Sequence, residues 1–182
     1  LVLGLVIVGA TWAWFTDDAE VENRFATGDV AITLHDLLDD EEFPVENGIS
    51  GVTPGDVYGK NVFVSSQGSV DTYVRVKLTP AWNKEEPSVM NDDPVLDVEL
   101  VELNLDLKNW VKIGDWYYYK HVLEKGDDTS KLLDGVTFST KIDNDYANAS
   151  FTIDVVAEAI QATNGAIEDF WKVDSNTWVS LE

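Results

Sequence analysis

The stretch VDTYVRVKLT, residues 70–79, decides the fold. Small apolar or hydroxyl side chains alternate through it with charged and aromatic ones. One set of alternate positions holds Val70, Thr72, Val74, Val76 and Leu78, and the other holds Asp71, Tyr73, Arg75 and Lys77. Alternation with a period of two is typical of a β-strand that buries one face. We therefore predict a strand here that packs against a second layer.

Similar patterns extend outward from this strand in both directions. We predict strands over residues 29–37, 57–65, 95–107, 135–142 and 151–158, and a hairpin over 108–121 that turns at Gly114-Asp115. Acidic stretches at 36–51, 84–94 and 124–134 are predicted as long loops, and the tail as a short helix followed by a strand. No long amphipathic helix is predicted. The chain is therefore expected to be all-β, with a jelly-roll-like β-sandwich as its form.

The first fifteen residues, LVLGLVIVGATWAWF, carry no charge and a single hydroxyl, Thr11. A signal peptide would have this apolar middle but also a basic flank, and a helix of this length reaches about 22 Å, short of the bilayer core. A strand fits the β-branched and aromatic content better, and Gly4 and Gly9 disfavour a helix. Since both faces are apolar, the strand must be covered on both sides. Its predicted contact residues are Leu1, Val2, Leu3, Leu5, Val6, Ile7, Val8, Trp12, Trp14 and Phe15.

Such a strand needs a groove. The groove can belong to the same sandwich or to a neighbouring copy, which would be strand addition between subunits. A membrane or detergent environment is the third alternative. The residues alone leave all three open.

The chain is strongly acidic. Its 34 acidic and 12 basic residues give a formal charge of −22 over 182 residues. Such a charge repels nucleic acid and anionic membrane surfaces, so we expect neither as a partner. The chain has no cysteine, which excludes disulfides, thiolate metal sites and a cysteine nucleophile.

No motif for catalysis stands out. His35 and His121 are isolated and do not form a zinc motif. Oxygen-rich acidic loops suit calcium, so the only cofactor considered is Ca²⁺, with ligands among Asp36, Asp39, Asp40, Glu41, Asp127 and Asp128. The aromatic run around Trp110 and Trp116 could line a glycan-binding face. Asn148 begins an N-glycosylation sequon, Asn-Ala-Ser.

Four pieces of the sequence resemble one family. They are TWAWFTD at 11–17, FATGDVAITL at 25–34, VTPGD at 52–56 and VVAEAIQATN at 155–164. In this order they are similar to the TasA/camelysin (CalY) family of exported biofilm-matrix and pilus-forming proteins, which is related to archaeal bundling pili. Residues 82–145 match nothing in that pattern. In much of this family the apolar run is removed with the signal peptide, so its presence here implies cleavage just upstream of Leu1.

The resemblance implies a secreted, cell-surface filament subunit. Residues 1–16 would be an N-terminal donor strand and residues 17–182 the β-sandwich domain with long acidic loops. Copies would join head to tail by donor-strand complementation, with no enzymatic activity and with the membrane met only during export. Two alternatives remain: a camelysin-like cell-surface metalloprotease, for which the sequence shows no zinc site, and a membrane-anchored glycan-binding module.

Overall fold

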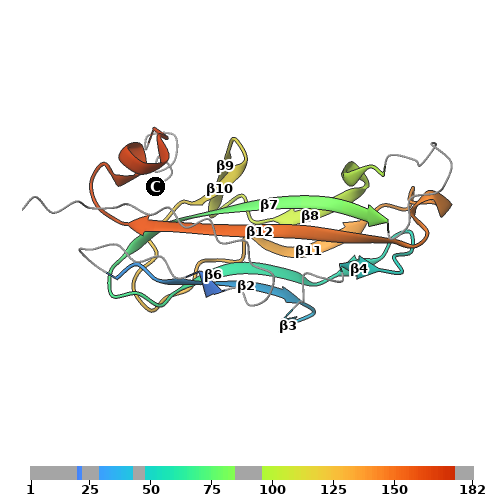
Figure 1. Ribbon diagram of the computed structural model, residues 1–182, viewed down its shortest axis with the longest axis horizontal. Helices are drawn as coiled ribbons and strands as arrows, with labels where there is room; N and C mark the ends of the chain where they lie inside the picture. Colours follow the sequence, from blue (N-terminus) through green and yellow to red (C-terminus); the bar gives the residue numbers. More distant parts are fainter. Residues whose placement is uncertain (1–19, 22–28, 43–47, 85–95, 175–182) are drawn as a thin grey trace, which may run out of the picture.

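A computed structural model describes residues 20–21, 29–42, 48–84 and 96–174 of the chain (Figure 1). The apolar run at 1–15, with all its predicted contact residues, lies outside the described residues. The same holds for most of the loop predicted at 84–94 and for the end of the tail.

The first sheet has seven antiparallel strands. Its main path runs β1-β2-β6-β11-β5, while β3 pairs with β2 and β8 with β11. The strands are β1 (Glu20–Val21), β2 (Ile32–Leu38), β3 (Glu41–Glu42), β5 (Val57–Tyr58), β6 (Lys60–Ser66), β8 (Val101–Leu105) and β11 (Leu133–Phe138).

The second sheet has five antiparallel strands in the order β4-β12-β7-β10-β9. They are β4 (Ile49–Ser50), β7 (Thr72–Lys84), β9 (Trp110–Ile113), β10 (Trp116–Tyr119) and β12 (Ala149–Gln161). Short helical turns complete the described chain: η1 (Val98–Leu100), η2 (Asn144–Tyr146) and η3 (Ile167–Trp171). In the described ranges no helix is long and apolar enough to cross a bilayer.

The two sheets stack face to face, so the predicted all-β sandwich is confirmed (Figure 1). The chain crosses repeatedly from one sheet to the other, for example from β6 to β7 and from β11 to β12. The inner faces share one apolar core. Four aromatic rings join the sheets at one end of it: Trp82 of β7, Phe151 of β12, Phe138 of β11 and Tyr58 of β5.

The strand predicted at residues 70–79 forms as β7, with one face buried. Thr72, Val74 and Val76 are fully buried in β7, and the charged or aromatic residues between them are partly exposed. The strand continues to Lys84, past the predicted end, although Pro80 lies within it. Pro80 pairs with Ile153 of β12, while on its other side β7 is paired with β10 only at Arg75 and Val76. The missing N–H of proline is tolerated because no strand adjoins that side of the residue.

Three local predictions need correction. The predicted loop at 36–51 contains the end of β2 and the short strands β3 and β4. The predicted strand at 95–107 is shorter, because Asp97 accepts a hydrogen bond from the N–H of Glu99 and caps η1 before β8 begins. The loop predicted at 124–134 ends earlier, because β11 begins at Leu133. The Gly114-Asp115 hairpin between β9 and β10 is confirmed, with Gly114 at a φ of 61°.

Candidate functional site

The outer edge of β12 is the most distinctive surface of the sandwich. On one side β12 pairs with β7 along its whole length, from Ala149 to Gln161. On the other side only Ser150 and Phe151 pair, with β4. Residues 152–161 therefore have no neighbouring strand on that side within the described part of the chain. This open edge is about 33 Å long, and about half of its backbone N–H and C=O groups point outward.

The inner side of this open edge is apolar. Ile153, Val155, Ala157 and Ala159 point into the core shared by the two sheets. Large side chains near β4 give way to two alanines farther along the strand. On the opposite face Val156 is 43% exposed. A strand added to this edge would meet a hydrophobic surface on one face and solvent on the other.

Strand β2 of the first sheet lies on the same side of the sandwich as β12. Its outer edge is paired with β1 at Ile32 and Thr33 and with β3 at Leu37 and Leu38. Between these pairs, residues 34–36 have no described strand beside them. Strand β1 thus lies on the side of the sandwich where β12 is open.

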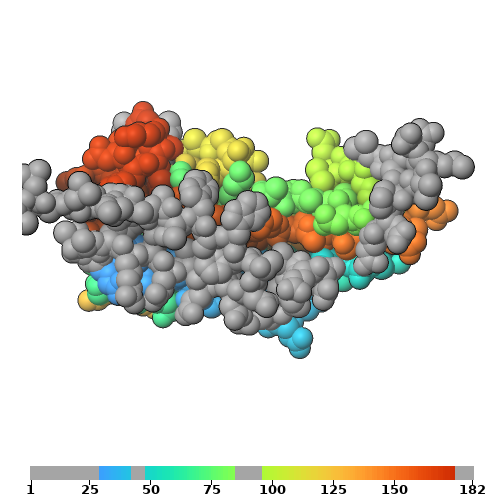
Figure 2. Space-filling view, viewed as in Figure 1, coloured from blue at the N-terminus to red at the C-terminus, as the bar shows by residue number. Residues whose placement is uncertain are grey.

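A cluster around Arg75 lies on the outer face of the second sheet. Its guanidinium donates to the Glu158 carboxylate from Nε at 2.8 Å and from Nη2 at 2.6 Å. It also stacks over the rings of Trp116 at 4.1 Å and Trp171 at 4.8 Å, and donates to the Tyr118 hydroxyl. These contacts hold η3 against the β9–β10 hairpin, and Figure 2 shows the two segments side by side.

The aromatic residues proposed for a glycan face take other roles. Trp110 is completely buried, and its indole N–H donates to the Ser130 carbonyl and hydroxyl oxygens. Tyr117 and Tyr118 are also buried. Trp116 is partly exposed but stacks on Arg75. Because stacking on a sugar needs an exposed ring, the structure removes Trp110 from any such face.

Three of the first four acidic residues predicted as calcium ligands make other side-chain contacts. Those in the first group are Asp36, Asp39, Asp40 and Glu41. Asp36 forms a buried ion pair with Lys60, Asp39 accepts a hydrogen bond from a backbone N–H, and Asp40 accepts one from the Asn61 amide. Glu41 is exposed in β3. Across the described ranges, no group of three or more His, Cys, Asp or Glu side chains is placed to hold a metal ion.

The other acidic pair, Asp127 and Asp128, fastens its loop to β6. The carbonyl of Asp127 accepts from the N–H of Ser66, and the carboxylate of Asp128 accepts from the hydroxyl of Ser65. The same hydroxyl contacts His35 Nε2 at 2.8 Å. No pattern in the sequence indicates this Ser–His–Asp cluster. These contacts tie β2, β6 and the loop at 127–128 together through one hydroxyl oxygen. The cluster is therefore a structural tie.

His35 and His121 are not brought together. His35 lies in β2 of the first sheet and stacks on Phe63 with ring centroids 4.4 Å apart. His121 is exposed just after β10 of the second sheet and contacts Asn109. Asn148, the predicted glycosylation site, is exposed in the turn before β12.

The VTPGD motif at 52–56 forms a tight turn. The hydroxyl and backbone N–H of Thr53 both donate to the carboxylate of Asp56, and these bonds hold the pKa of Asp56 below its usual value. Gly55 takes a φ of 87° and donates its N–H to the carbonyl of Phe138. The motif thus positions β5 beside β11 and has a structural role.

Comparison with known proteins gives one family. The profile described as "Camelysin metallo-endopeptidase" matches residues 1–148 of the chain. No curated protein and no solved structure matches it. The match includes the apolar run at 1–15, the VTPGD turn and both sheets up to the turn that precedes β12. Because it spans well over half of the sequence, the chain belongs to the camelysin family.

Proposed function

We propose that this protein is the structural subunit of an extracellular filament, polymerised by donor-strand complementation. The apolar run at 1–15 of one copy adds as a strand to the open edge of β12 in the next copy. The observation that carries the proposal is this edge at 152–161, which has no strand beside it in the described chain and an apolar inner side.

The dimensions suit this pairing. Fifteen extended residues reach about 50 Å, which exceeds the length of the open edge. Each backbone hydrogen bond contributes about 0.5–1.5 kcal/mol net, and burial of each large apolar side chain about 1.5–3 kcal/mol. Several such terms together exceed the cost of ordering the segment, so the contact should dissociate slowly.

The proposal divides the chain into two parts with different roles. Residues 1–16 are the donor strand, and residues 17–182 form the sandwich that receives it. A contact between two different surfaces of the same molecule is heterologous and extends into a filament unless it closes into a ring. Secretion to the cell surface is part of the proposal, with other copies of this chain as the partners and the membrane met only during export.

The test compares the full chain with a truncation that lacks residues 1–14. We expect filaments of the full chain in negative-stain electron microscopy and monomers of the truncation in light scattering. A synthetic peptide of residues 1–15 with a solubilising lysine tag should raise the melting temperature of the truncation. The matched control is the same peptide with Leu5 and Ile7 replaced by aspartate, which should have no effect. Filaments of the truncation would refute the proposal.

A metallo-endopeptidase is the second candidate, because the family description names that activity. Elemental analysis and a casein-cleavage assay with and without a chelator distinguish the two. Stoichiometric zinc with chelator-sensitive cleavage would support the protease. His35→Ala and His121→Ala would then show whether either histidine takes part.

A further inference from the structure

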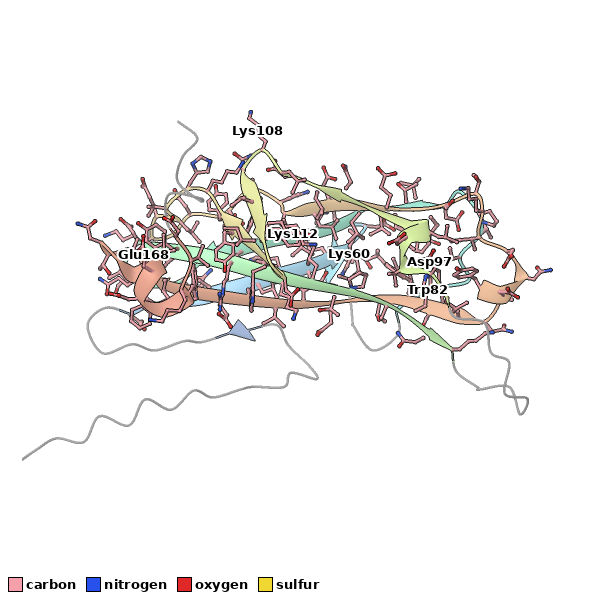
Figure 3. All side chains as sticks on the ribbon, turned by 90° about the horizontal axis from the view of Figure 1, so that it is seen from above. Lys60, Trp82, Asp97, Lys108, Lys112 and Glu168 are labelled. Carbon is pink, nitrogen blue, oxygen red and sulfur yellow. The ribbon has the colours of Figure 1, made fainter. Side chains whose placement is uncertain are left out.

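Lys60 and Asp36 form an ion pair inside the sandwich. Lys60 precedes Val62 on the inner face of β6, and Asp36 follows Leu34 on the inner face of β2. The side chain of Lys60 is 2% exposed and that of Asp36 is 7% exposed. Figure 3 shows Lys60 within the body of the sandwich, whereas Lys108 projects into solvent. The two strands are adjacent, with Leu38 opposite Lys60 and Asp36 opposite Val62.

The contact between the two side chains is one-sided. The Nζ atom of Lys60 donates to Oδ1 of Asp36. The second carboxyl oxygen, Oδ2, is buried and has no hydrogen-bond partner in the described part of the protein. A buried carboxylate oxygen without a partner is costly, so this arrangement needs an explanation.

Burial acts on both groups in the direction of neutrality. It raises the pKa of the Asp36 carboxyl despite the opposing charge of Lys60, and it lowers the pKa of the Lys60 amine despite Asp36. Transfer of one proton along the existing contact, from Nζ to Oδ1, gives a neutral amine beside a carboxylic acid. An uncharged amine is a nucleophile, and a protonated carboxyl has a leaving group.

We propose that Lys60 and Asp36 are joined by an intramolecular isopeptide bond. The lone pair of Nζ attacks Cγ of Asp36, the Cγ–Oδ1 bond breaks, and Oδ1 leaves as water with protons taken from the carboxyl and the amine. The product is a neutral secondary amide whose carbonyl oxygen is Oδ2. No oxidant, reductant or other reactant is required.

The site favours this condensation for two physical reasons. The amide removes two charges from a buried place, where their mutual attraction does not fully compensate for the loss of hydration. The ladder between β2 and β6 also holds the two groups together, so the reaction has a high effective concentration. The bond would link adjacent strands covalently in a chain that has no cysteine for a disulfide.

Mass spectrometry of the purified full chain tests the proposal. We expect an intact mass lower than that of the sequence by one water molecule, about 18 Da. Trypsin applied after denaturation cleaves after Arg24, Lys60 and Arg75 in an unlinked chain. Because trypsin does not cleave after an acylated lysine, the linked chain gives a single peptide of residues 25–75 that lacks one water. Peptides 25–60 and 61–75 at their unmodified masses would overturn the proposal.

Two variants make the result specific. K60R removes the nucleophilic amine but keeps a trypsin site, so it should give the full intact mass and cleavage after position 60. D36A keeps Lys60 but removes the acyl group, so Lys60 should become cleavable. A persistent block in D36A would assign the block to another cause and overturn the proposal. A succinimide at an aspartate also loses one water, but it leaves Lys60 cleavable and would count against the isopeptide bond.

Discussion

Replacement of Phe138 by alanine should separate the two sheets at one end of the core. The Phe138 ring is 1% exposed. It meets the rings of Tyr58 and Phe151 edge to face, at 5.8 Å and 5.5 Å, and lies tilted against Trp82 at 5.7 Å. These partners come from both sheets, and Phe151 belongs to β12, whose open edge begins one residue later. Phe138 therefore helps to fix the strand that carries the candidate site.

The size of the effect follows from these contacts. A buried phenylalanine truncated to alanine typically costs about 3–5 kcal/mol, because apolar contacts are lost and a cavity remains. Phe138→Leu keeps most of the volume but loses two edge-to-face pairs, each worth about 0.5–1.5 kcal/mol. We therefore expect about 1–3 kcal/mol for leucine. For a chain of this size, each kcal/mol lowers the melting temperature by about 2–4 °C.

The assay is urea unfolding followed by tryptophan fluorescence, with thermal unfolding by circular dichroism as the second measurement. The free energy of unfolding should fall in the order wild type, Phe138→Leu, Phe138→Ala. Equal losses for the two variants would show that ring geometry contributes nothing. A loss below about 1 kcal/mol for alanine would be far under the usual cost of truncating a buried ring and would refute the placement of this ring between the sheets.

Three further predictions concern other parts of the sandwich. Arg75→Lys keeps the charge but loses the forked hydrogen bonds and the stacking on Trp116, so it should lower stability by about 1–2 kcal/mol and change the tryptophan emission. Partial burial raises the pKa of Asp106, but hydrogen bonds from neighbouring side chains and backbone lower it by more. The pKa of Asp106 therefore lies below its usual value. The ionised carboxylate stabilises the fold fully above the unfolded pKa of about 3.9, and this stabilisation is lost as the pH falls through the folded pKa. Asp106→Asn should therefore lower the melting temperature at pH 7. The difference from wild type should shrink in more acidic buffer. Gly48→Ala should destabilise the protein more than Gly51→Ala. Both glycines have positive φ, but only at Gly48 would an added Cβ meet β12, 2.9 Å from the nearest atom. Equal melting temperatures of the two variants would contradict this contact.

The sequence predicts the strands whose alternation is regular. Residues 70–79 identified β7 because one set of positions holds only small apolar or hydroxyl side chains. The Gly114-Asp115 turn identified the hairpin because a two-residue turn of this type needs a residue that accepts positive φ. The end of β7 was missed because proline normally ends a strand, and the pairing that permits Pro80 depends on where β10 stops.

The sequence could not predict the buried pair or the Arg75 cluster. Asp36 continues the inward-facing positions of β2 and lies where the strand predicted at 29–37 overlaps the acidic loop predicted at 36–51, so the pattern alone gives no sign that its side chain is buried. Lys60 lies in the strand predicted at 57–65, but a lysine in an alternating pattern is expected to face solvent. The Arg75 cluster joins β7, β10, β12 and η3. These segments are far apart in the sequence, and only the order and packing of the folded strands bring them into contact.

The charge distribution of the chain bears on how its copies would meet in the proposed filament. All 34 acidic and 12 basic residues fall after position 15, so the sandwich carries the whole charge of −22 while the run at 1–15 carries none. Two such sandwiches repel each other when their strand edges come close together. Salt screens this repulsion at separations beyond about 8 Å. A neutral extended segment can reach the open edge of β12 before the two charged bodies come close. The same acidity that opposes random pairing of the exposed edge therefore favours the uncharged run at 1–15.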